Sequence, residues 1–204
     1  MNKYYYEGKT KEAAIELALQ ELKISDEDLV INNIEEKSGL LKKSVKIEVL
    51  NVNEVISFIK DTISEITRNM GAEANLEVRR RENNISVTIF SDNNSILIGK
   101  NGKNVAALQL LIRQMVNSKL NTPLGIIIDV GNYKEKRAKN IEYLAKKLAR
   151  EAYKTKTEVT MDSMNSYERR IVHEALAEDK YVYTESIGEE PNRKVVIKIK
   201  EEQK

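Results

Sequence analysis

The chain has 204 residues, with 34 Lys and Arg against 32 Asp and Glu, so its formal net charge is only +2. It contains no cysteine and one histidine, His173, which excludes disulfides, thiolate zinc sites and cages of several histidines. Its nine Tyr and two Phe are too few and too scattered for an aromatic sheet platform that stacks bases. We therefore expect no metal, no cofactor and no enzyme, although counting residues does not exclude a hydrolase built on paired carboxylates.

The sequence also lacks membrane and export signals. No stretch approaches the ~20 apolar residues of a membrane span, and residues 1–6 open no signal-peptide core. We expect a soluble, cytoplasmic protein.

The charge is arranged in blocks along the chain. Residues 1–74 carry 10 basic and 14 acidic side chains, residues 75–156 carry 16 and 7, and residues 157–204 carry 8 and 11. A basic middle between acidic ends is typical of a protein that binds a polyanion with part of its chain. Chance clustering of solvated lysines and arginines is the alternative explanation.

The first 51 residues are predicted to form a β-α-β-β module with a weak first strand. The expected elements are a helix over 9–23, capped by Thr10, and strands over 29–34 and 45–50. A polar connection that contains Ser38 and Gly39 separates the two strands.

Residues 52–131 are predicted to follow the order α-β-β-α-α-β. The expected elements are a helix over 52–70, hairpin strands over 76–80 and 85–90, a short helix over 95–98, a longer helix to about 119, and a strand over 124–130. The first helix is the clearest, because apolar residues recur every three or four positions until Gly71. Thr122-Pro123 is expected to end the last helix.

Residues 132–204 are predicted to form a third, α/β module that begins with a long basic helix. The expected elements are helices over 133–154 and 165–177, a strand over 158–161, and paired strands over 181–187 and 194–199. The expected apolar positions of the second helix are Tyr167, Ile171, Ala175 and Leu176. The predicted fold class is α+β, with three small modules over residues 1–51, 52–131 and 132–204.

The loop Gly99-Lys100-Asn101-Gly102 suits a phosphate backbone. Glycines allow a nucleic-acid chain to approach the main chain without Cβ clashes, and the following helix presents free N–H groups. Lys100 and Lys103 add positive charge, and Ile98 would belong to the floor of a groove for splayed bases. Taken alone, Gly-x-x-Gly is a weak signal, since most such pairs are turns, and the Walker A spacing is absent.

The position of this loop gives it more weight. Leu97-Ile98-Gly99-Lys100-Asn101-Gly102-Lys103-Asn104-Val105 matches the core motif of KH domains, and residues 52–130 resemble a type II KH domain. The resemblance implies that the loop clamps a few nucleotides of single-stranded RNA or DNA. The site residues that it implies are Ile98, Gly99, Lys100, Asn101, Gly102 and Lys103.

A second candidate site is the Arg-x-x-x-His spacing of Arg169 and His173, which places both residues on one helical face. A guanidinium and an imidazole displayed together can grip one phosphate or stack on a base. For an isolated pair, a surface pair satisfied by local carboxylates is the more frequent explanation. A general-base role for His173 is disfavoured, because no nucleophile partner is visible.

The surrounding sequence changes this balance. Residues 135–200 resemble the R-three-H domain, a module that binds single-stranded nucleic acid and has this Arg and His as its signature. The resemblance implies that Arg169 and His173, with the adjacent Arg170, contact nucleic acid.

Basic residues also line one face of the helix expected over 133–154. This stripe comprises Lys139, Tyr143, Lys147, Arg150 and Lys154. It would track phosphates, with Lys139, Lys147 and Arg150 as contacts, or it is an ordinary solvated face. The triple arginine at 79–81 allows the same two interpretations.

The order of the three modules resembles the bacterial Jag family, the SpoIIIJ-associated proteins, and residues 6–15 match the start of its N-terminal domain. The resemblance implies a cytoplasmic single-stranded RNA-binding protein of a Gram-positive bacterium. It would act as an RNA chaperone or post-transcriptional regulator that affects cell division, elongation and envelope synthesis. The implied partner is a small KH-only protein, KhpA, and the resemblance leaves open whether the protein forms a homodimer.

An alternative function uses the same resemblance. The N-terminal module would dock on a YidC-type membrane insertase or a division protein and bring the protein to the membrane periphery, with nucleic-acid binding secondary. The acidic first block suits this adaptor, whereas the basic middle block and the two nucleic-acid signatures suit the RNA-binding protein.

Overall fold

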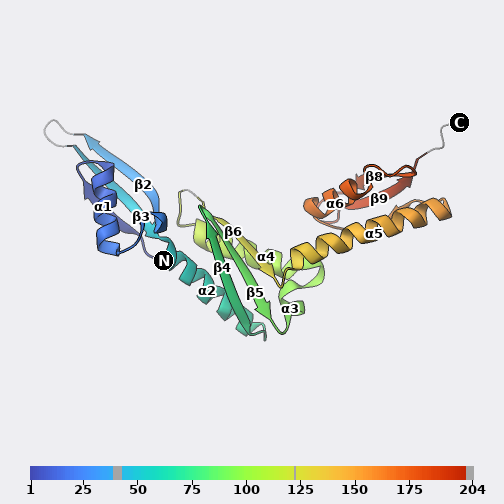
Figure 1. The fold of residues 1–204 in the computed structure, drawn as a ribbon, viewed down its shortest axis with the longest axis horizontal. Coiled ribbons are helices and arrows are strands. Elements are labelled where there is room, and N and C mark those ends of the chain that lie inside the picture. The colour runs from blue at the N-terminus through green and yellow to red at the C-terminus, as the bar shows by residue number, and fades with distance from the viewer. Residues whose placement is uncertain (39–42, 122, 201–204) are drawn as a thin grey trace. The chain divides into compact units, whose positions relative to one another are not determined.

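The computed structural model describes residues 1–38, 43–121 and 123–200 (Figure 1). By its internal contacts, the chain divides into two compact units, Met1–Gly131 and Asn132–Lys204. The α+β fold class is confirmed, with a separate three-stranded sheet in each of the three predicted modules. No helix among the described residues is long and apolar enough to cross a membrane.

The first unit begins with the expected β-α-β-β module. Its elements are β1 (Tyr4–Gly8), α1 (Lys11–Leu22), β2 (Leu29–Ser38) and β3 (Lys43–Asn51), and the antiparallel sheet has the order β1-β3-β2. Thr10 caps α1 as predicted, because its Oγ1 accepts from the Ala13 N–H at 3.2 Å. The strand β2 is longer than expected, and the residues after Ser38 in the polar connection lie outside the described part.

The same unit continues with the order α-β-β-α-α-β. Its elements are α2 (Val52–Asn69), β4 (Ala74–Arg81), β5 (Asn84–Ser91), α3 (Asn94–Ile98), α4 (Lys103–Asn117) and β6 (Gly125–Val130). The sheet order is β4-β5-β6, with β5 and β6 parallel. One face of the sheet is buried with α2 and α4, since Ile85, Val87, Ile126 and Ile128 are at most 3% exposed. The expected break at Thr122-Pro123 falls partly outside the described residues.

Polar contacts join the two modules of the first unit. A bulge in β2 leaves Asn32 buried, and its side chain accepts from the Asn121 N–H at 2.6 Å and donates to the Lys119 carbonyl at 3.3 Å. The Arg80 guanidinium pairs with Asp28 at 3.0 Å and donates to the Glu27 carbonyl. These contacts explain why residues 1–131 form one unit, and the boundary at 51/52 stays an interpretation from the sequence.

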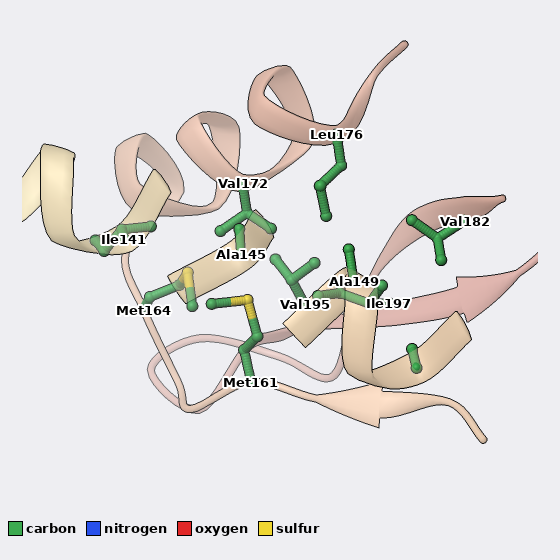
Figure 2. Close-up of a cluster of buried hydrophobic side chains, with 11 residues drawn as sticks. Ile141, Ala145, Ala149, Met161, Met164, Val172, Leu176, Val182, Val195 and Ile197 are labelled. Atoms are coloured by element: carbon green, nitrogen blue, oxygen red, sulfur yellow. The ribbon is translucent and has the colours of Figure 1, made fainter. Parts of the chain in front are cut away.

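The second unit contains α5 (Tyr133–Thr155), β7 (Val159–Thr160), α6 (Ser166–Leu176), β8 (Val182–Ile187) and β9 (Lys194–Ile199). Its antiparallel sheet has the order β7-β9-β8. Figure 2 shows the core, in which side chains of α5, α6, the β7–α6 connection and the sheet meet. Asn165 begins α6 with a capping box. Its side chain accepts from the Glu168 N–H, and the Glu168 carboxylate accepts from the Asn165 N–H.

The predicted apolar face of α6 is partly wrong. Leu176 is buried as expected, but Tyr167 is 64% exposed, and Val172 is the other fully buried apolar residue. Glu168 and Arg169 share the buried face. These two charged residues can be buried because their charges are compensated inside the module. The spacing of apolar residues in the sequence does not indicate such compensation.

Candidate nucleic-acid interface

The Gly-x-x-Gly loop is held between α3 and α4 in a left-handed backbone. The φ angles of Gly99, Asn101 and Gly102 are 70°, 54° and 76°. A Cβ atom on Gly99 would lie 2.5 Å from the Asn104 side chain, so this position requires glycine. Asn104 in turn donates to the Ile96 carbonyl at 2.8 Å and ties α4 back to α3. This role of Asn104 was not predicted from the sequence.

The loop presents its charged groups outward. Lys100, Asn101 and Lys103 are exposed, whereas Gly102 is buried. Neither lysine forms an ion pair within the described residues. Gly102 is the N-cap of α4 and has no side chain to bond the first N–H groups of the helix. The loop therefore combines two cations with an uncapped helix N-terminus, an arrangement that suits a phosphate.

An apolar surface adjoins the loop. Ile98 is half-buried immediately before Gly99, and Ile96 is 40% exposed on α3. Apolar side chains beside a phosphate site can contact the faces of unstacked bases.

The Arg-x-x-x-His pair is held inside the second unit. Arg169 is 7% exposed, and its Nη1 donates to the Met164 carbonyl at 2.8 Å and pairs with Glu190 Oε1 at 2.7 Å. Both ring nitrogens of His173 are engaged, Nδ1 with Thr184 Oγ1 at 2.6 Å and Nε2 with Ser186 Oγ at 2.8 Å. The two side chains thus bind α6 to β8 and to the loop before β9, a positioning role that the spacing alone did not reveal.

The electrostatics around these two residues favour an anion. Burial, together with the positive charges of Arg169 and Arg193, lowers the pKa of His173. The Nε of Arg193 is buried and has no hydrogen-bond partner among the described residues. A buried donor without an acceptor is costly, and a negatively charged oxygen would satisfy it. The cluster of the Arg169, His173 and Arg193 side chains is called the α6 pocket below.

The remaining predicted residues lie on the surface of the second unit. Arg170 points outward and pairs with Glu174 at 2.7 Å. On α5, Lys139 is likewise paired, with Glu135 at 2.6 Å. Lys147 and Arg150 are exposed and form no ion pair within the described part of the chain. Lys154, which belongs to the same stripe, is likewise exposed and forms no ion pair among the described residues, so three cations of the basic stripe are unpaired there.

The triple arginine is largely used inside the first unit. Arg79 pairs with Glu77 at 2.6 Å on the same strand. Arg80 contacts Asp28 and Glu27, as described above.

Among the described residues, no group of three or more His, Asp or Glu side chains could hold a metal ion.

Comparisons with known proteins match all three modules. Residues 6–50 match the Jag N-terminus, residues 57–127 match the KH domain of KhpA and KhpB, and residues 139–198 match the R-three-H domain. The RNA-binding protein KhpB of Clostridium symbiosum is 35% identical over 203 residues, which cover 96% of this chain and 90% of the relative. The KhpB of Bacillus subtilis is 28% identical over 197 residues and is covered to 95% of its length.

The fold and the two candidate sites define a protein that combines a KH domain with an R-three-H domain. Within that class, the chain belongs to the KhpB family, also known as Jag. The named relatives are RNA-binding proteins.

Proposed function

We propose that this protein binds single-stranded RNA through the Gly-x-x-Gly loop of its first unit. The observation that carries the proposal is the exposed pair Lys100 and Lys103 at the uncapped N-terminus of α4. Gly99 and Gly102 leave room for the phosphates, and the exposed Asn101 lies between Lys100 and Lys103 in the sequence. The half-buried Ile98 offers an apolar surface to a base. Family membership supports RNA as the ligand.

The α6 pocket is proposed as a second phosphate site. An RNA phosphate would accept from Arg193 and from Arg169, whose current anionic partner is the 57% exposed carboxylate of Glu190. His173 would hold the hydroxyls of β8 in place around it. Outside the pocket, Arg170, Lys139, Lys147 and Arg150 would attract the backbone of the RNA.

In the cell, we propose a role as a post-transcriptional regulator or RNA chaperone that affects cell division, elongation and envelope synthesis. Two RNA-binding sites on separate units suit such a role, because they raise the effective concentration of one site for RNA held at the other. Sequencing RNA crosslinked to the protein in cells would test it. Recovery of discrete transcripts is expected, and recovery of no RNA above a mock sample would contradict the role.

The proposed protein partner is a small protein with a KH domain. The outer face of α4 exposes two adjacent leucines, Leu110 (61%) and Leu111 (48%), on the module that matches the KhpA and KhpB family. Leu110→Lys should abolish assembly with a KhpA-type protein in light scattering after gel filtration. Leu17→Lys, at an exposed leucine of α1, is the matched control and should leave assembly intact.

The main experiment reverses the charge of the loop. In the full chain, Lys100→Asp with Asn101→Asp should weaken binding of a uridine 12-mer about tenfold or more, because charge-assisted phosphate contacts are lost. Lys60→Asp with Asn53→Asp makes the same charge change at exposed positions of α2 and should have little effect. Equal affinities of the two double variants would refute the loop as the RNA site.

A further inference from the structure

Two tyrosines of the second unit stack on each other. Tyr153 lies in the last turns of α5 and Tyr181 immediately precedes β8, and their ring centroids are 4.2 Å apart with an interplanar angle of 32°. The Lys156 Nζ lies 4.3 Å from the Tyr153 centroid. The tertiary fold therefore builds an aromatic cluster that the scattered tyrosines of the sequence did not predict.

Within the part of the chain that the structure describes, one ring face of this cluster has neither a ring nor a cation stacked on it. A second ring and an ammonium group at about 4 Å cannot share one face of Tyr153, so they cover its two opposite faces. Among the described residues, Tyr153 is the ring that stacks on Tyr181, and Tyr181 is 52% exposed, against 37% for Tyr153. Its outer face is thus a flat aromatic surface supported from behind.

The surroundings of the cluster are basic. Lys154 and Lys156 follow Tyr153 in the sequence, and Lys180 precedes Tyr181. The Lys200 backbone N–H donates to the Tyr181 carbonyl at 2.8 Å, and its Nζ donates to the Asp179 carbonyl at 2.6 Å, so its ammonium group is held at Asp179, two residues before Tyr181 along the chain. The nearby Asp179 carboxylate accepts from the N–H groups of Tyr181 and Val182, at 2.8 and 3.2 Å, so part of its charge is compensated.

We propose that Tyr181, backed by Tyr153, is a stacking site for a base of single-stranded RNA. An aromatic face among lysines matches a base with its phosphates, whereas a protein partner of apolar chemistry would not require the lysines. The inference rests on the proposed RNA-binding function. Along β8, Thr184 and Ser186 lie three and five residues beyond Tyr181, or roughly 10–17 Å at ~3.3 Å per residue. By this distance, a single strand of 12 nucleotides is long enough to reach both the stacking site and the α6 pocket.

The test compares uridine oligomers of 4 and 12 nucleotides on the full-length protein. Tyr181→Ala should weaken binding of the 12-mer about fivefold or more, while Tyr181→Phe should retain parental affinity. The matched control is Tyr5→Ala in the first unit, because Tyr5 is 55% exposed and also has a lysine over its ring, with Lys46 Nζ 5.0 Å from the centroid. The short oligomer should lose less affinity, since it can bind at the Gly-x-x-Gly loop without contacting Tyr181.

Parental affinity of Tyr181→Ala for the 12-mer would overturn the stacking site and leave the RNA-binding function standing. A parent protein that binds neither oligomer would overturn both. A change of oligomeric state in sedimentation without a change of RNA affinity would identify a protein-binding patch instead. If Tyr181→Ala does not fold, the proposal is tested instead by crosslinking the parent protein to a 12-mer that contains 4-thiouridine. Mass spectrometry should find the crosslink at Tyr181 or Tyr153, and its absence there would refute the proposal.

Discussion

Replacing Arg169 with Ala should unfold the second unit at a distinctly lower temperature. The guanidinium is 7% exposed and donates to the Met164 carbonyl at 2.8 Å. A hydrogen bond from a charged donor contributes about 1.5–3 kcal/mol. The partner carboxylate of Glu190 is more than half exposed, so the ion pair adds little. A loss of about 2 kcal/mol in a domain of this size corresponds to roughly 8–16 °C in Tm.

The matched control is the next residue on the same helix. Arg170 has a side chain that is 76% exposed and contacts only Glu174, one turn away, among the pairs described. Arg170→Ala should therefore melt near the parent temperature. Scanning calorimetry of the full chain would follow the transition of the second unit in both variants. Equal melting temperatures would show that Arg169 is not a structural clamp. RNA affinity measured well below both transitions then reports its separate contribution to binding.

Two further predictions concern pH and salt. The pKa of His173 is lowered in the folded protein, so the unfolded chain binds the proton more readily. The second unit should therefore lose stability as pH falls below the ordinary histidine pKa of about 6.5. Melting curves between pH 7.5 and 5.5 should show this loss in the parent and not in His173→Gln. If phosphate occupies the α6 pocket, RNA binding should strengthen over the same range in the parent only, as titrations at both pH values would measure. The logarithm of RNA affinity should fall linearly with the logarithm of salt concentration, with a slope of about −0.7 for each phosphate contacted on a single strand. The double variant Lys147→Glu with Arg150→Glu should have a flatter slope. A slope near zero in the parent would mean that the basic stripe is only a solvated surface.

Much of the fold could be predicted from local signals. The period of apolar residues identified α2 and its end near Gly71, because the helix buries one continuous stripe. Alternation about a short turn identified the β4–β5 hairpin, and the connection before β9 separated the last two strands. These elements need no information about distant residues.

The contacts that decide the sites required the tertiary structure. Arg169 sits on a buried helix face because Met164 and Glu190 satisfy it, and hydropathy assigns any arginine to the surface. Arg80 looked like part of a cationic patch, but it pairs with Asp28 in another module. Tyr153 and Tyr181 become neighbours only when the end of α5 meets the start of β8.

The most direct test of RNA binding at two sites is an NMR titration of the labelled full-length protein with a uridine 12-mer. We expect shifts in the amide signals of Gly99 to Asn104, and separately in those of Arg169, His173 and Arg193. Binding at the loop should persist in Arg169→Lys, and binding at the α6 pocket should persist when Lys100 and Asn101 are both replaced by Asp. Shifts confined to one of the two sites, or found at neither of them, would contradict the account.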